Sequence, residues 1–270
     1  NNILGWVNSV YYSVEERRSR ILEELQVKDK VYVKVLAEQF GVTMETIRRD
    51  LDALAAEKKI KKTFGGAIKV KSTSFELLYN ERALYNVAAK QKIAATAVSL
   101  IEDNDTIALL GGSTTEQLLQ PLLTKRGLFV VTNSLPMALG LLHCRKEGSF
   151  DGRVVVIGGE ATSASLAMSG FFAEDMLTKV AVNKAFLSCA GFAPQSVSTL
   201  IEENIRLSQI LLEKSATKIL LADSAKMNAS YLYHFATLRD FDIVVCDQKM
   251  PNEWESEVEV DRLQWLTAQK

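Results

Sequence analysis

The pattern of apolar and polar positions near the start of the chain predicts three helices in succession. Each helix has one stripe of apolar residues that recur at helical spacing. The stripes consist of Ile21, Leu22 and Leu25; of Val35, Leu36 and Phe40; and of Ile47, Leu51, Leu54 and Ala55. Ser13 and Glu16 form a capping box before the first helix, which continues to about Gln26, and Gly41 ends the second. Val31–Val33 is a candidate strand, and the order of the helices is that of a helix-turn-helix.

The third predicted helix carries polar residues near its beginning. Thr43 can cap the helix start, and Thr46, Arg48 and Arg49 lie on the face opposite the apolar stripe. This is the end that a recognition helix inserts into the major groove of DNA. We therefore expect the two threonines to position the helix and the two arginines to contact phosphates and guanines.

Lysines dominate the segment after the third helix. Residues 60–70 alternate around Gly65-Gly66, which predicts a β-hairpin, or wing. Lysines 58, 59, 61, 62, 69 and 71 occur there without an acidic residue. We expect Lys61, Lys62, Gly65 and Gly66 to lie against DNA phosphates, where binding depends on salt. The alternatives are a solvated turn, or a helix-turn-helix that packs on another protein.

The rest of the chain alternates helical and strand-like segments. After a polar stretch at residues 71–80, which we take as a linker, Ala83–Ile101 predicts one long helix, and shorter helices end near Leu123 and Leu142. Strands are predicted at Thr106–Leu110, Leu128–Val131, Val154–Ile157, Lys184–Ser188, Lys218–Ala222 and Ile243–Cys246. This alternation indicates an α/β domain with a mainly parallel sheet. The predicted domains are residues 13–70, for the winged helix-turn-helix, and residues 81–270.

Small and hydroxylated residues follow the ends of several predicted strands. Ligands of parallel sheets bind at the carboxyl ends of the strands, where glycines allow close approach and helix starts attract anions. We therefore expect a shared anion pocket. Its candidate residues are Gly111, Gly112, Ser113, Thr114, Thr115, Thr132, Asn133, Ser134, Gly158, Gly159 and Lys226.

Composition limits the remaining choices. The 270 residues are 47% hydrophobic, enough for two domains, and the net charge is −1, so any affinity for nucleic acid must come from local clusters. The three cysteines lack a paired spacing and are typical of reduced thiols in a cytoplasmic protein, and neither histidine has the spacing of a metal ligand. No stretch reaches membrane-spanning length. Residues 1–12 are apolar without a basic start, so they fit a secretory signal poorly and are either a remnant or a short extension.

Two motifs identify a family. Thr46–Leu51, of sequence TIRRDL, followed by Gly65-Gly66-Ala67, resembles the signature of the DeoR family of bacterial transcriptional regulators, and the resemblance runs from about Arg17 to Asp247. It implies a winged helix-turn-helix and a C-terminal sensor domain similar in fold to ribose-5-phosphate isomerases. It also implies the pocket residues named above as the site for a phosphorylated sugar or polyol. The expected protein is a cytoplasmic homodimer or homotetramer that represses a carbohydrate-metabolism operon by binding double-stranded operator DNA, without cofactor or metal.

The chain departs from the family pattern at several positions. The family usually has Arg and His where this chain has Lys62 and Phe64, Asp where it has Leu110, and Gly where it has Gln195. No basic residue occurs from residue 154 to residue 178, where the family commonly has one. A lost carboxylate and a lost cation weaken the capture of sugar hydroxyls and phosphate, so the expected effector is unusual or binds weakly.

An isomerase with a DNA-binding appendage is the alternative function. Aldose–ketose isomerisation requires a carboxylate base beside the substrate carbon. The loop at residues 188–194 contains no acidic residue, whereas Glu202 and Glu203 remain nearby in the sequence. We therefore expect a regulator rather than an enzyme.

Overall fold

A computed structural model describes residues 12–28, 30–57, 59–69, 79–162, 165–258 and 262–268. The chain divides into two compact units, Asn1–Thr73 and Ser74–Lys270, and each is described by itself. Most of the predicted linker, residues 71–78, lies outside the described residues, as do Lys58, Lys71 and most of the N-terminal extension. The domain boundaries therefore stay predictions.

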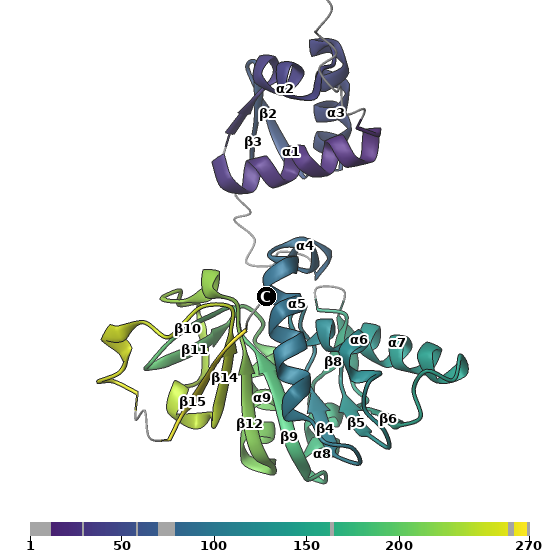
Figure 1. Cartoon of the computed structure of the whole chain (residues 1–270), viewed down its shortest axis with the longest axis vertical. Coiled ribbons are helices and arrows are strands. Elements are labelled where there is room, and N and C mark those ends of the chain that lie inside the picture. Colours follow the sequence, from purple (N-terminus) through teal and green to yellow (C-terminus); the bar gives the residue numbers. More distant parts are fainter. Residues whose placement is uncertain are drawn as a thin grey trace, which may run out of the picture. The chain divides into compact units, whose positions relative to one another are not determined.

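The first unit is a winged helix-turn-helix (Figure 1). Its elements are α1 (Val14–Lys28), β1 (Lys30–Tyr32), α2 (Val33–Phe40), α3 (Met44–Ala56), β2 (Ile60–Thr63) and β3 (Gly66–Lys69). The strands pair antiparallel in the order β1-β3-β2. The predicted capping box is confirmed, because Ser13 N donates to Glu16 Oε2 at 2.9 Å and Glu16 N donates to Ser13 Oγ at 3.1 Å.

The core of the first unit follows the predicted stripes with one correction. Val35 was expected to face inward, but its side chain is 49% exposed. Helix α2 begins at Val33, so its buried stripe consists of Val33, Leu36, Ala37 and Phe40. Gly41 ends this helix with φ +64°, a left-handed conformation that glycine adopts without steric cost.

A buried ion pair joins α1 to α3. Arg17 Nε donates to Asp50 Oδ2 at 2.5 Å, and Arg18 Nε donates to Asp50 Oδ1 at 3.0 Å. The side chains of Arg17 and Asp50 are almost completely buried. Because a buried charge without a partner is costly, this pair holds the third helix against the first.

Among the described residues of the second unit, seven parallel strands form one sheet, here called the main sheet (Figure 1). The strands are β4 (Thr106–Leu109), β5 (Phe129–Thr132), β6 (Arg153–Val156), β9 (Val182–Ser188), β12 (Ser215–Leu221), β14 (Ile243–Cys246) and β15 (Gln264–Thr267). Their order is β15-β14-β12-β9-β4-β5-β6. The predicted α/β class is confirmed, and β15 was not foreseen.

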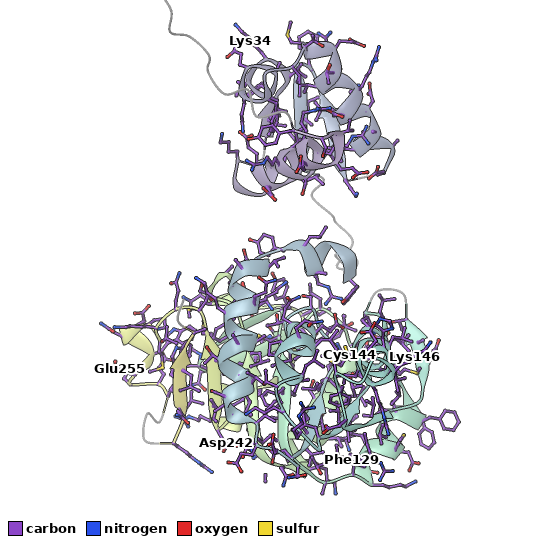
Figure 2. The ribbon with its side chains drawn as sticks, turned by 45° about the vertical axis from the view of Figure 1, so that its right-hand side comes forward. Lys34, Phe129, Cys144, Lys146, Asp242 and Glu255 are labelled. Atoms are coloured by element: carbon purple, nitrogen blue, oxygen red, sulfur yellow. The ribbon has the colours of Figure 1, made fainter. Side chains whose placement is uncertain are left out.

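Helices cover both faces of the main sheet. Helices α5 (Val87–Ala97) and α7 (Leu135–Lys146) contribute to one buried cluster, and α8 (Phe171–Thr178) and α9 (Glu203–Lys214) contribute to the other. Figure 2 shows Cys144 and Lys146 on α7; Cys144 is buried. Shorter helical elements are α4 (Tyr79–Leu84), α6 (Leu119–Leu122), η1 (Val98–Leu100), η2 (Thr115–Leu118), η3 (Ser224–Lys226), η4 (Leu238–Asp240) and η5 (Asn252–Trp254).

Two sequence-based expectations for these helices are wrong. The long helix predicted at Ala83–Ile101 is divided into α4, α5 and η1, with Asn86 at φ +52° between the first two. The loop after β4 does not lead directly into an α-helix but into the 3₁₀ turn η2 and the single turn α6.

The antiparallel pieces of the second unit were also not foreseen. Strands β7 (Glu160–Thr162) and β8 (Ala167–Ser169) form a hairpin, and β10 (Gly191–Ala193), β11 (Ser196–Thr199) and β13 (Tyr233–Ala236) form a small sheet. In the described part of the chain, no helix is both long enough and apolar enough to cross a membrane.

We predict that Asp50→Ala destabilises the first unit by about 3–5 kcal/mol, because it leaves Arg17 buried without its partner. Hydrogen exchange of the α3 amides, measured on the full chain by mass spectrometry, should accelerate accordingly. Asp52→Ala on the same helix removes an exposed pair with Lys62. It should change the free energy of opening, as derived from the exchange rates, by less than about 1 kcal/mol. Equal exchange in the two variants would show that the buried pair is not important for stability.

Candidate functional site

The beginning of α3 is held by its own threonines. Thr43 Oγ1 accepts a hydrogen bond from Thr46 N at 3.2 Å and lies 2.9 Å from Thr46 Oγ1. The predicted cap is therefore confirmed. Their contact with DNA stays a prediction.

Arg48 and Arg49 project from the surface of the first unit, with exposures of 57% and 79%. Each guanidinium lies 3.6 Å from the carboxylate of Glu45, which is itself exposed. Ion pairs exposed to water contribute little energy, so both arginines can exchange Glu45 for a phosphate or a base.

The wing is present as predicted, with Phe64-Gly65 as its turn and Gly66 already paired in β3. Lys61 is exposed, and the ammonium of Lys62 donates to Asp52 Oδ1 of α3. Gly66 lies against Val31 O so closely that a side chain would not fit. This contact explains the second glycine by packing, whereas Gly65 requires its positive φ of +76°.

In the second unit, the candidate ligand residues lie at the edge where the parallel strands end, here called the carboxyl edge. Because β5 and β6 follow β4 on one side and β12 follows β9 on the other, the strand order reverses between β4 and β9. Such a reversal is where ligands bind in open α/β sheets. Gly112, after β4, packs against Ser188 at the end of β9 without room for a side chain.

Hydrogen bonds connect several of the predicted loops. Lys226 Nζ, after β12, lies 3.3 Å from Thr114 Oγ1, and Gly111 N donates to Asn133 Oδ1 at 2.7 Å. Gly159, with φ +144°, instead packs against Ser169 of β8. The loops after β4, β5 and β12 are thus brought together at the carboxyl edge.

Some predicted ligand hydroxyls brace these loops. Thr115 Oγ1 lies 2.7 Å from Leu110 O and 2.8 Å from Gly112 O, and Thr132 Oγ1 donates to Leu109 O at 2.7 Å. Ser134 Oγ accepts from Met137 N at 3.2 Å and so caps α7. These side chains hold the loop backbones in place, whatever they contact in a complex.

Lys90 is a charged residue of this edge that sequence reasoning missed. It is 2% exposed on α5, and its Nζ donates to Arg82 O at 2.5 Å and to Ser113 Oγ at 3.0 Å. Burial, and to a lesser extent the positive charge of Lys226, lower the pKa of Lys90 to about 8. The available signal was its helical spacing, because Lys90 shares the buried face of Ile93, Ala94 and Ala97.

Asp223 and Glu116 were also missed. The buried Asp223 accepts from Asn86 Nδ2 at 2.8 Å, and its Oδ2 lies 3.5 Å from Lys226 Nζ. Glu116 Oε1 accepts from Ser134 Oγ at 2.8 Å, and its Oε2 accepts from the hydroxyl of Tyr79. Burial raises the pKa of the Glu116 carboxyl.

Five polar residues at this edge are here called the edge cluster: Lys90, Ser113 and Asp223, which are buried, and Glu116 and Lys226, which are half-buried. Two ammonium groups beside carboxylates and hydroxyls suit a ligand that carries both a phosphate and hydroxyl groups. Glu202, considered as an isomerase base, instead accepts from Tyr233 OH at 3.1 Å at an exposed position. Within the described residues, no group of three His, Cys, Asp or Glu is placed to hold a metal ion.

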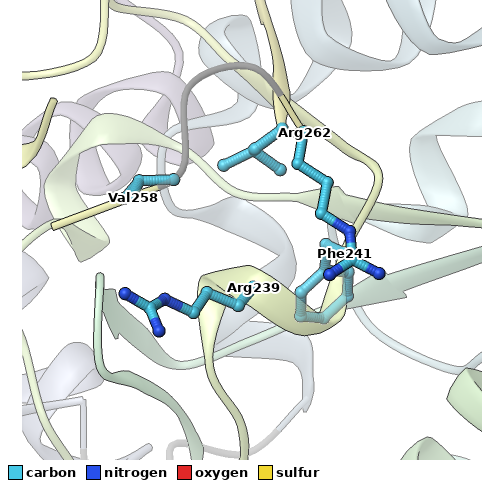
Figure 3. A pocket seen from close by; sticks show the side chains of 5 residues that line it. Arg239, Phe241, Val258 and Arg262 are labelled. Carbon is cyan, nitrogen blue, oxygen red and sulfur yellow. The ribbon is translucent and has the colours of Figure 1, made fainter.

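A small pocket lies at a different place in the second unit (Figure 3). Its lining residues are Arg239, Phe241, Val258, Arg262 and Leu263. Several of them immediately precede β14 and β15, so the pocket adjoins the amino ends of these strands, opposite the carboxyl edge. It contains none of the predicted ligand residues.

Comparison with known proteins gives matches over most of the chain. Residues 17–73 match the profile of the DeoR-like helix-turn-helix domain, and residues 85–248 match that of the DeoR C terminal sensor domain. The uncharacterized HTH-type transcriptional regulator YulB of Bacillus subtilis is 35% identical over 87% of this chain and 89% of its own length. The lactose phosphotransferase system repressor of Lactococcus lactis is 30% identical over 87% and 92%, and the transcriptional repressor AccR of Agrobacterium fabrum is 28% identical over 88% and 91%.

Similar solved structures are more distant. Ribose 5-phosphate isomerase A from Methanocaldococcus jannaschii has 16% identity and a TM-score of 0.37, covering 53% of this chain and 55% of its own. The delta subunit of translation initiation factor eIF-2B from A. fulgidus has 11% identity and a TM-score of 0.45, covering 86% and 81%. Similarity at this level supports no conclusion about function.

We predict that Glu45→Gln strengthens the binding of duplex DNA by about two- to fivefold, because the carboxylate that pairs with both arginines is removed. Fluorescence anisotropy with a labelled duplex measures the change. Glu15→Gln on α1 alters the net charge equally and serves as the matched control. Equal effects of the two substitutions would indicate a general charge effect rather than release of Arg48 and Arg49.

Proposed function

We propose that this chain, which belongs to the DeoR family of DNA-binding transcriptional regulators, represses a carbohydrate-metabolism operon. We further propose that a small phosphorylated sugar or polyol controls this repression. The effector would bind at the carboxyl edge of the main sheet. Three relatives support this assignment, since they are named as repressors, two of them of a lactose phosphotransferase system. A homodimer or homotetramer would place two recognition helices on half-sites about one helical turn apart, or a multiple of it.

The edge cluster is the observation that carries the effector proposal. Lys90 and Lys226 are cations from two separate elements, and Asp223 lies beside Lys226. Lysine ammonium groups bind phosphate as point charges, and carboxylates accept hydrogen bonds from sugar hydroxyls. The chain lacks the family's carboxylate at Leu110 and its basic residue along residues 154–178. The charges of Lys90 on α5 and of Asp223 and Lys226 after β12 partly replace them.

Helix α4 supports a route by which the effector could act on DNA binding. Tyr79, Arg82 and Asn86, on α4 and the turn after it, contact Glu116, Lys90 and Asp223 of the edge cluster. An effector that binds these three residues would change the contacts of α4. Because residues 71–78 connect this helix to the first unit, a shift of α4 would bias the DNA-binding unit, provided that the effector binds the two arrangements with different affinity.

We expect Arg48→Ala and Arg49→Ala each to weaken binding to a selected operator by about ten- to a hundredfold, because each guanidinium contacts phosphate or guanine. The operator is obtained by selecting duplexes from a random pool with the wild-type chain. Arg206 is an exposed arginine of α9 in the second unit. As a control, Arg206→Ala removes the same charge and should leave the affinity for the operator unchanged. If both α3 variants kept the wild-type affinity, the recognition-helix assignment would be wrong.

The affinity for a phosphorylated effector should fall as the pH rises above about 8. Lys90 has a pKa of about 8, so it loses its proton and its attraction for phosphate in this range. The effector is first identified by a thermal-shift screen of sugar and polyol phosphates, and its affinity is then measured by titration calorimetry between about pH 7 and pH 9.

Lys90→Met keeps the apolar stem of the side chain and should both weaken effector binding and flatten its pH dependence. Lys226→Ala should weaken binding and move the decline to a higher pH, because the charge of Lys226 contributes to the lowered pKa of Lys90. Wild-type binding that is constant across this pH range would exclude Lys90 as a phosphate ligand.

A further inference from the structure

Phe64 occupies the turn of the wing with its ring completely in solvent, at an exposure of 105%. Thr63 pairs with Gly66, so Phe64 and Gly65 alone form the connection between β2 and β3. A large aromatic side chain in this position buries no surface in the folded unit. Its contribution to affinity is therefore available to a partner.

The backbone that carries this ring is held on two sides. Gly65 O accepts from Val33 N at 2.9 Å, at the first residue of α2. Strand β3 pairs with β1 as well as with β2, with Tyr32 opposite Gly66. The turn is thus presented in one position, and little backbone freedom would be lost when Phe64 binds a partner.

Exposed lysines lie on β2 and α2, the two elements that hold the turn. Lys61 is exposed on β2, and Lys34 lies on the surface of α2 next to the residue that binds the turn (Figure 2). Lys62 connects β2 to Asp52 of α3. A partner of such a surface needs phosphates for the lysines and an apolar groove for the phenylalanine ring. Duplex DNA has both, because phosphates line the outside of its grooves and apolar edges of sugars and bases lie within them.

We infer that Phe64 makes an apolar contact with deoxyribose and base edges of the minor groove adjoining the major groove that α3 enters, an inference that rests on the proposed function. The lysines beside it bind the phosphates between the two grooves. Apolar side chains at such positions partly unstack flexible base steps, so Phe64 gives the protein a preference for deformable pyrimidine–purine steps. This contribution does not involve the release of counterions and persists at high salt.

The test compares four variants on a duplex that the wild-type chain selects from a random pool. Phe64→Ala should bind about tenfold more weakly at every salt concentration, with the slope of log affinity against log salt unchanged. Phe64→Leu, which keeps an apolar side chain, should retain most of the affinity. Lys61→Ala should reduce the slope by about one. Phe64→His, which carries the usual residue of the family, should bind between Phe64→Leu and Phe64→Ala.

Footprinting separates the two grooves. In the Phe64→Ala complex, sugars on the minor-groove side should lose their protection from hydroxyl radicals, whereas guanine N7 atoms in the major groove stay protected from dimethyl sulfate. Wild-type affinity of Phe64→Ala, an affinity loss that disappears at high salt, or unchanged sugar protection would each overturn the inference. If the wild-type chain itself selected no duplex, the proposed function rather than the role of Phe64 would fail.

Discussion

The burial of Lys90 is the constraint on which the arrangement of the carboxyl edge depends. An ammonium group that leaves water needs hydrogen-bond acceptors and negative charge nearby. In a continuous helix, Arg82 O would accept from Asn86 N. Here the left-handed conformation of Asn86 interrupts the helix, and Arg82 O accepts from Lys90 Nζ and from Tyr85 N. The same interruption lets Asn86 donate to Asp223. The division between α4 and α5 therefore provides a hydrogen-bond acceptor for the buried ammonium group of Lys90.

Local patterns predicted much of the fold because they depend on neighbours in sequence. The helix-turn-helix, the Thr43 cap and the wing follow from helical spacing, capping chemistry and the Gly65 turn. Most strands of the main sheet were recognised as short apolar runs between polar segments. The failed prediction at Ala83–Ile101 has a different origin, since Asn86 leaves the helix to satisfy Asp223, which is distant in the sequence. Tertiary contacts there override local helix propensity.

The candidate site was predictable in position but not in its charges. Parallel strands end at one edge, so the loops after β4, β5 and β12 had to lie near one another. Lys90 and Glu116 are on helical elements rather than loops, and the burial of Lys90 and the half-buried position of Glu116 depend on how α5 and η2 pack. Several loop hydroxyls that resembled ligand groups instead brace the backbone. The rigid loops thus set the geometry of the candidate site, and the charged side chains supply the attraction for a ligand.

The pairing of β4 with β9 also sets the order in which the second unit can fold. Ile107 pairs with Lys184, so the centre of the main sheet joins segments that are separated in the chain by β5, β6, β7 and β8 and by the helices between them. Contacts between such distant segments form slowly, because a long loop must close first. During synthesis the helix-turn-helix leaves the ribosome long before β9 does. Its pairing of Lys30 with Ile68 also spans fewer residues than the pairing of Ile107 with Lys184. A nascent chain therefore holds a folded DNA-binding unit while its ligand-binding unit is still incomplete.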